Sequence, residues 1–209
     1  MKIEKPLLRG HIHQAMFFVT IGACLLLVLK AQAMLATIAT IVFSIGALMM
    51  FGVSATYHRI TWGEQGRALM KKLDHSSIYL MIAGTFTPIC LLALPKDSGS
   101  ELLITIWIVA AVGLLQSIFF VNLPKFVSAL IYIIAGYLIV PYMGDLSGTF
   151  SHSQFALLII GGIAYTIGGL SYGLKWPKLS PQYFGYHEVF HIFVSIGAAL
   201  HFALVYSLV

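Results

Sequence analysis

The feature that most constrains this chain is a succession of seven long apolar runs separated by short breaks. A helix needs about 20 apolar residues to cross a bilayer, and each run is close to that length. The runs are continuous rather than alternating, and they are about twice as long as the strands of a membrane β-barrel, which excludes that architecture. We therefore expect seven transmembrane helices, at residues 15–29, 34–57, 76–94, 102–123, 126–143, 155–174 and 189–209.

The composition supports an all-α membrane protein. Only 9% of the 209 residues are charged and 59% are hydrophobic, whereas about a quarter of the residues of a soluble domain are charged. The seven spans leave no room for a separate soluble domain or a nucleotide-binding fold, so we expect a single transmembrane domain over residues 1–209. Cys24 and Cys90 both lie in apolar runs and predict neither a disulfide framework nor a metal site.

The basic residues predict how the bundle is oriented. Ten of the twelve fall on the side of the N-terminus, and only Lys30 and Lys96 fall on the opposite side. Because basic loops stay in the cytoplasm, we expect a cytoplasmic N-terminus and an external C-terminus, the reverse of a G-protein-coupled receptor. The net charge of +5 then reflects membrane orientation, and nucleic acid is not an expected partner. The ten residues are Lys2, Lys5, Arg9, Arg59, Arg67, Lys71, Lys72, Lys125, Lys175 and Lys178.

Ionisable residues meet at the cytoplasmic ends of three expected helices. His58 ends the second helix, Asp74 precedes the third, and His187 and His191 precede or begin the seventh. His187 and His191 are four residues apart, so on a helix they project from one face, a spacing that suits two nitrogens of one zinc ion. His58 would supply the third nitrogen and leave a fourth position open for water.

Two further side chains fit a hydrolytic site at this depth. Asp74 would hold or deprotonate the water, and Ser54, one helical turn before His58, would donate a hydrogen bond to the water or the carboxylate. A zinc ion with three histidines lowers the pKa of bound water to about 7. The simpler interpretation is that these histidines are interfacial polar residues, and imidazole ligands would also accept other transition metals. Their coincidence with Asp74 at one depth favours the metal site.

Four other histidines are expected to have structural roles and not to bind the metal ion. His11 and His13 are interpreted as anchors at the level of the lipid headgroups. His75 projects about 100° away from its neighbour Asp74 on a helix, so we expect it to face another helix. His201 lies about 15 Å further along the seventh helix than His191, too far to share a metal ion, and a hydrogen-bonded packing role is expected.

The same residues carry a resemblance to a known family. The motifs Ser54-Ala-Thr-Tyr-His58, Lys72-Leu73-Asp74 and His187-Glu-Val-Phe-His191 resemble the S-x3-H, D and H-x3-H signature of the progestin and adipoQ receptor family. The bacterial haemolysin III branch is the most similar, and the segment from Lys5 to Gly10 also resembles it. The resemblance spans nearly the whole chain and implies a multi-pass protein of the bacterial inner (plasma) membrane.

The resemblance also implies a site. It implies seven helices with the N-terminus inside and a zinc ion near the cytoplasmic side. His58, His187 and His191 would be the zinc ligands, Asp74 would act through water, and Ser54 would join the surrounding hydrogen bonds. Related alkaline ceramidases cleave lipid amides, and ceramidase activity is attributed to the adiponectin receptors. The long cytoplasmic N-terminal region of the eukaryotic receptors has no counterpart in this sequence, so hormone signalling is not carried over.

Two functions at the zinc site are weighed first. One is a zinc-dependent hydrolase of membrane lipid amides or esters that contributes to lipid homeostasis, with the acyl chain entering between helices. The other is a non-enzymatic sensor or receptor for lipid or membrane state, in which structural zinc clamps the helices. The sequence does not decide between them, and it specifies no oligomeric state.

Two further functions are disfavoured. Residues His187 to His191 match H-E-x-x-H, in which Glu188 would be the general base of a metalloprotease, but the third ligand of one such class fails because Gly197 stands in its place. A pore-forming haemolysin is disfavoured because the spans offer few polar residues along a full path and the basic residues indicate a resident membrane protein.

Overall fold

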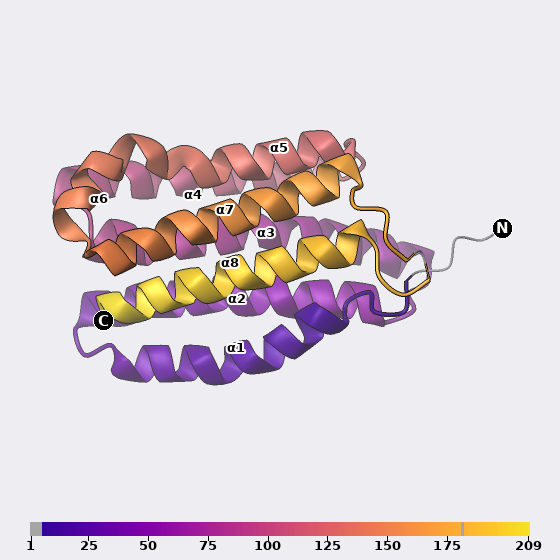
Figure 1. The fold of residues 1–209 in the computed structure, drawn as a ribbon, viewed down its shortest axis with the longest axis horizontal. Coiled ribbons are helices and arrows are strands. Elements are labelled where there is room, and N and C mark those ends of the chain that lie inside the picture. Colours follow the sequence, from indigo (N-terminus) through magenta and orange to yellow (C-terminus); the bar gives the residue numbers. More distant parts are fainter. Residues whose placement is uncertain (1–5, 181) are drawn as a thin grey trace.

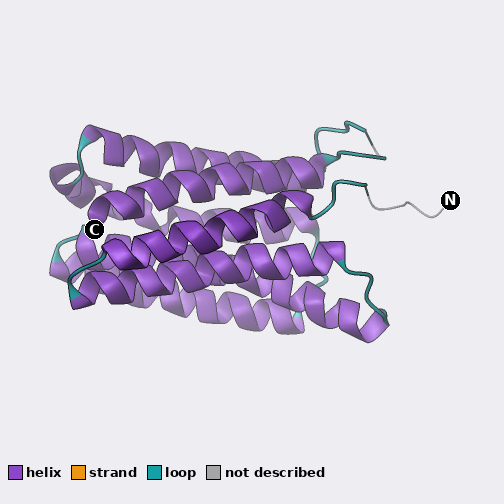
Figure 2. Cartoon of the chain, turned by 90° about the horizontal axis from the view of Figure 1, so that it is seen from below, coloured by secondary structure: helices purple, strands orange, loops and turns teal. Residues whose placement is uncertain are grey.

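The computed structural model describes residues 6–180 and 182–209, and this part of the chain is an antiparallel bundle of helices (Figure 1). Short loops join the helices at both ends of the bundle (Figure 2). Within the described residues the only β-type pairing is an isolated bridge between Ser180 and Phe184. The elements are α1 (His11–Lys30), α2 (Met34–Arg59), α3 (Glu64–Leu92), α4 (Lys96–Phe119), α5 (Lys125–Gly136), the 3-10 segment η1 (Tyr137–Tyr142), α6 (Met143–Thr149), α7 (His152–Leu174) and α8 (Tyr186–Leu208).

Among the described residues, seven helical stretches are long and apolar enough to cross a membrane, which confirms the predicted all-α, seven-span architecture. Six are single helices, and the seventh is the composite of α5, η1 and α6 over Lys125–Thr149. Lys30 lies at the opposite end of α1 from Arg9, as the count of basic residues requires. Lys2 and Lys5, which entered that count, lie outside the described residues. The orientation in the membrane stays a prediction.

Several helix boundaries differ from the predicted ones. α3 begins at Glu64 rather than at residue 76. Its first three turns are too polar to count as part of an apolar run, but they contain good helix formers and continue the helix beyond it. α8 begins at Tyr186, so His187 lies in its first helical turn instead of in a loop. The fifth predicted span, 126–143, is interrupted: Pro141 lies in η1, and the chain turns there into α6.

Close helix packing brings the end of α2 beside α3. A Cβ atom on Gly46 of α2 would lie 2.7 Å from the backbone oxygen of Leu80, and one on Gly84 of α3 would lie 3.2 Å from that of Val42. Only glycine allows the two backbones to approach this closely. The contact fixes α2 against α3, and it thereby holds His58 at the level of Asp74 on the neighbouring helix.

The chain before α1 covers the end of the bundle at which α2 ends and α8 begins. The backbone amides of Leu7 and Leu8 donate to the carbonyl oxygens of Gln182 and Tyr183, at 2.9 and 3.2 Å. Gly10 has a φ of 84°, and a Cβ atom there would lie 2.7 Å from the Cβ of His58. Two reasons therefore require glycine at this position: its backbone conformation and the close approach of His58. It lets α1 begin directly beside the histidines.

Candidate metal centre

Three histidines from two helices converge at this end of the bundle. One ligand nitrogen from each of His58, His187 and His191 lies within 4.8 Å of the others, and all three residues are buried. The Nε2 atoms of His58 and His187 are 3.2 Å apart, a distance at which they would share a hydrogen bond in the absence of a metal. Two nitrogens bound tetrahedrally to zinc at 2.0–2.1 Å would be about 3.3 Å apart. The donor set and its spacing therefore fit zinc, as the sequence predicted, and ligation itself stays a prediction.

Asp74 lies beside this cluster, at the position the sequence predicted. Its Oδ2 atom is 3.7 Å from the Nε2 of His58, the nitrogen that faces His187. The carboxylate side chain is 16% exposed, so it is shielded from bulk water but borders the cavity described below. A carboxylate in this place can accept a proton from a water molecule that lies among the three imidazoles.

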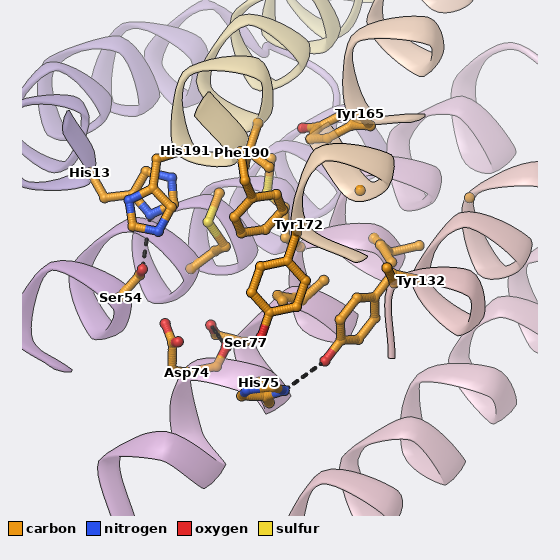
Figure 3. A pocket seen from close by; sticks show the side chains of 18 of the residues that line it. His13, Ser54, Asp74, His75, Ser77, Tyr132, Tyr165, Tyr172, Phe190 and His191 are labelled. Atoms are coloured by element: carbon orange, nitrogen blue, oxygen red, sulfur yellow. Dashed lines mark hydrogen bonds between the residues drawn. The ribbon is translucent and has the colours of Figure 1, made fainter. Parts of the chain in front are cut away.

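Ser54 also lies next to the histidines, where it has the expected partner and a second one that was not expected. Its hydroxyl lies 2.9 Å from the Nδ1 of His13, which comes from α1 (Figure 3). The sequence predicted a bond from Ser54 to water or to a carboxylate. The Ser54 hydroxyl is also a hydrogen-bond partner of the Asp74 carboxylate, as expected, and the contact with His13 is an addition to it.

The interpretation of His13 as a headgroup anchor is wrong. Its side chain is 2% exposed, and its ring stacks on that of His191 with the centroids 3.7 Å apart and the planes at 10°. Figure 3 shows the two rings side by side above Ser54. The burial of His13 could have been predicted from helical spacing, since the buried residues of α1 are His13, Thr20, Cys24 and Leu27. That signal is weak because α1 is apolar on nearly all sides.

Glu188 is not part of the group of three histidines that can share a metal ion. It is fully buried, and both of its carboxylate oxygens are engaged: Oε1 by the Nε of Arg9, and Oε2 by the backbone amide of Gly185 at 2.7 Å. The side chain therefore caps the start of α8 and holds the segment before α1 against it. A carboxylate bound in this way is not placed to act as the general base of an H-E-x-x-H protease.

The predictions for His75 and His201 agree with the structure. The Nδ1 of His75 lies 3.0 Å from the hydroxyl of Tyr132 on α5, so His75 does face another helix. The Nε2 of His201 lies 3.2 Å from the carbonyl oxygen of Leu158 on α7, the hydrogen-bonded packing role expected for it. His201 is also outside the group of three histidines that can share a metal ion.

A cavity of about 320 Å³ adjoins the histidines and extends between the helices. Its lining includes Asp74 and the three histidines at one end and Tyr165 and His201 deeper in the bundle. Between them the walls are largely apolar, with Met81, Phe86, Ile133, Phe190 and Val194 among the lining residues. Figure 3 shows Tyr132, Tyr172 and Phe190 around this space, above Asp74 and Ser77. A space of this kind suits a long apolar group whose polar end lies at the histidines.

Comparisons with known proteins cover most of the chain. The sequence profile of a family described as Haemolysin-III related matches residues 1–202. The Hemolysin-3 of Bacillus cereus is 36% identical over 167 residues, which cover 80% of this chain and 73% of that protein. The Hemolysin-3 homolog of Bacillus subtilis is 33% identical over 161 residues, 77% of this chain and 72% of that protein. The adiponectin receptor protein of Drosophila melanogaster is 27% identical over 203 residues, 87% of this chain but 46% of the receptor.

Proposed function

Because the chain belongs to the haemolysin-III-related family of multi-pass membrane proteins, we propose that it is a zinc-dependent hydrolase of membrane lipid amides or esters. It acts at the cytoplasmic face of the bacterial plasma membrane and contributes to lipid homeostasis. The observation that carries this proposal is the convergence of three buried imidazoles and one carboxylate at the end of an apolar cavity.

The chain's own residues supply binding and proton transfer. His58, His187 and His191 would hold the zinc ion, which when bound lowers the pKa of water to about 7 and polarises a carbonyl oxygen. The apolar cavity walls receive the acyl chain and bring its carbonyl carbon to the end where Asp74 lies. Proximity alone lowers the barrier, since water, carbonyl and base are held together.

Asp74 is the general base and then the general acid. Its carboxylate takes a proton from water as the water oxygen bonds to the carbonyl carbon. When the carbon–nitrogen or carbon–oxygen bond breaks, Asp74 returns that proton to the leaving amine or alcohol, and a fatty acid is released. Both carboxylate oxygens of Glu188 already have partners, Arg9 and the backbone amide of Gly185 at the start of α8. This supports Asp74 as the carboxylate that transfers the proton.

A second function has an observation in its favour. The ligands come from α2 and α8, so a bound metal ion would clamp two helices in the way that a structural zinc does in a sensor of lipid or membrane state. In that case the protein would hold zinc without hydrolysing lipids.

The test measures fatty acid release by mass spectrometry from ceramides and glycerolipids incubated with the purified, zinc-loaded protein. We expect release by the wild type, a loss of about 10²–10⁴-fold in Asp74→Asn, and unchanged zinc content in that variant. Wild-type protein that holds zinc and releases no fatty acid from any of these lipids would contradict the hydrolase and favour the sensor. Equal rates for the wild type and Asp74→Asn would contradict the role given to Asp74.

A further inference from the structure

The end of the cavity nearest the histidines carries an excess of positive charge. Four of its described lining residues are cationic, and Asp74 is the one acidic residue among them; the cations are Arg9, Arg67, Lys71 and Lys125. Arg9 is neutralised by Glu188. Three cations therefore accompany one carboxylate at the end of the cavity where the histidines lie, whereas the walls further in are largely apolar.

Lys125 is held in place rather than free to move in solvent. Its Nζ donates a hydrogen bond to the hydroxyl of Tyr186 at 2.8 Å and lies 4.8 and 5.0 Å from the ring centres of Tyr172 and Tyr186. Aromatic rings and a hydroxyl orient an ammonium group but leave its charge uncompensated. The side chain of Lys125 is thus already ordered in the folded protein, so binding an anion costs less of its conformational entropy.

Lys71 continues this cationic edge on α3. Its Nζ donates to the side-chain oxygen of Asn122 at 2.7 Å, again a neutral partner. Arg67 lies one turn earlier on the same helix, with its guanidinium 5.5 Å from the ring centre of Tyr57. Lys71 precedes Asp74 by three residues, which is about 4.5 Å along the helix axis. The positive charge therefore lies one helical turn from the carboxylate to which the hydrolytic role is given.

We propose that Arg67, Lys71 and Lys125 bind the phosphate of an anionic phospholipid whose acyl chain occupies the cavity. Like charges at the edge of a low-dielectric cavity repel one another, and an anion between them removes that cost. Ammonium and guanidinium groups are strong hydrogen-bond donors to phosphate. A glycerophospholipid joins its phosphate to the ester carbonyl through glycerol, which suits a cationic edge one turn from Asp74. A lipid with a neutral headgroup, such as ceramide, would leave these cations without an anionic partner.

This inference rests on the proposed function for the position of the acyl chain, but its test is binding alone. Native mass spectrometry of the full chain in non-ionic detergent measures affinities for phosphatidylglycerol and for diacylglycerol with the same acyl chains. The measurements use the Asp74→Asn background, so that neither lipid is consumed. We expect phosphatidylglycerol to bind about tenfold more tightly, as one or two charge-assisted hydrogen bonds would give. The double variant Lys71→Gln/Lys125→Gln, and each single variant to a lesser degree, should lose this preference.

A matched control separates the cavity edge from general attraction between basic residues and lipids. Lys175 and Lys178 are exposed, lie at the same end of the bundle and do not line the cavity, so Lys175→Gln/Lys178→Gln removes the same charge elsewhere. We expect this control to keep the preference for phosphatidylglycerol. Inorganic phosphate should compete weakly, because it lacks the acyl chain.

The outcomes distinguish this inference from the proposed function. Equal affinities for the two lipids, an equal loss in the control variant, or complete displacement by inorganic phosphate at the lipid's own concentration would overturn the phospholipid site. Binding with the expected pattern, together with no release of fatty acid by the wild type from phosphatidylglycerol or from any of the ceramides and glycerolipids above, would instead overturn the hydrolase and leave the binding site standing.

Discussion

Aromatic rings surround each of the three candidate ligands and limit the directions in which their nitrogens can point. His13 stacks on His191, and the ring of Tyr172 meets that of His187 edge to face with the centroids 5.4 Å apart. The ring of Tyr57 lies 4.6 Å from that of His58. Neighbours that orient a histidine keep it ready for a metal and increase the affinity of the site. The convergence of the nitrogens is therefore a property of the packing of α1, α2, α7 and α8.

At the same scale, Glu188→Gln distinguishes a structural carboxylate from a catalytic one. The substitution leaves the partly buried Arg9 without its counter-charge, so we expect the thermal unfolding temperature in detergent to fall, with little change in zinc content. Arg9→Gln should lower the unfolding temperature too. Because the two residues are paired, the decrease in the double variant should be smaller than the sum of the two single decreases. A metalloprotease base at Glu188 would give the opposite pattern, an inactive protein of unchanged stability.

The sequence predicted that four ionisable residues lie close together, because the topology alone brings the ends of their helices to one depth. These residues are His58, Asp74, His187 and His191. It did not identify the burial of His13, since a histidine close to a basic residue at the start of a span is typical of an interface. The position of α1 against α2 depends on Gly10 and its approach to His58, a tertiary contact that spacing along one helix does not reveal. The contact of Ser54 with His13 was not predicted for the same reason, whereas its contact with Asp74 was.

At the scale of the helices, the approach of α2 to α3 should control the site from a distance. Gly46→Ala would place a Cβ atom 2.7 Å from the backbone oxygen of Leu80, and only a shift of one helix could relieve that overlap. We expect a lower thermal unfolding temperature, from a cost of about 1–3 kcal/mol, and weaker retention of zinc. Gly22→Ala on α1 is the matched control, because no atom lies within 4 Å of its Cβ position. Equal behaviour of the two variants would show that this contact does not position the site.

The helices themselves were largely predictable, and their ends were not. Apolar length predicts a span, but it does not report how far a helix continues beyond the bilayer, as α3 does back to Glu64. That extension places Lys71 and Asp74 on one rigid helix. Likewise, Pro141 does not interrupt the apolar run in the sequence, yet it lies in η1, the segment that separates the end of α5 from the start of α6.

For the whole molecule, the distribution of basic residues predicts the orientation in the membrane. We expect a C-terminal alkaline phosphatase fusion to be active and a C-terminal green fluorescent protein fusion to be dark, since each reporter works on one side of the bacterial membrane. The same reporters placed after Lys125 are the internal control and should give the reverse result. An active phosphatase at Lys125 would put the histidines on the external face and contradict hydrolysis at the inner leaflet.

The metal content of the purified protein tests the central claim most directly. Protein prepared in detergent without chelators is measured by inductively coupled plasma mass spectrometry, together with His58→Ala, His191→Ala and Asp74→Asn. We predict about one zinc ion per chain in the wild type, its loss from both histidine variants and its retention in Asp74→Asn. Wild-type protein without any transition metal, or histidine variants that keep the full complement, would contradict a metal centre at His58, His187 and His191.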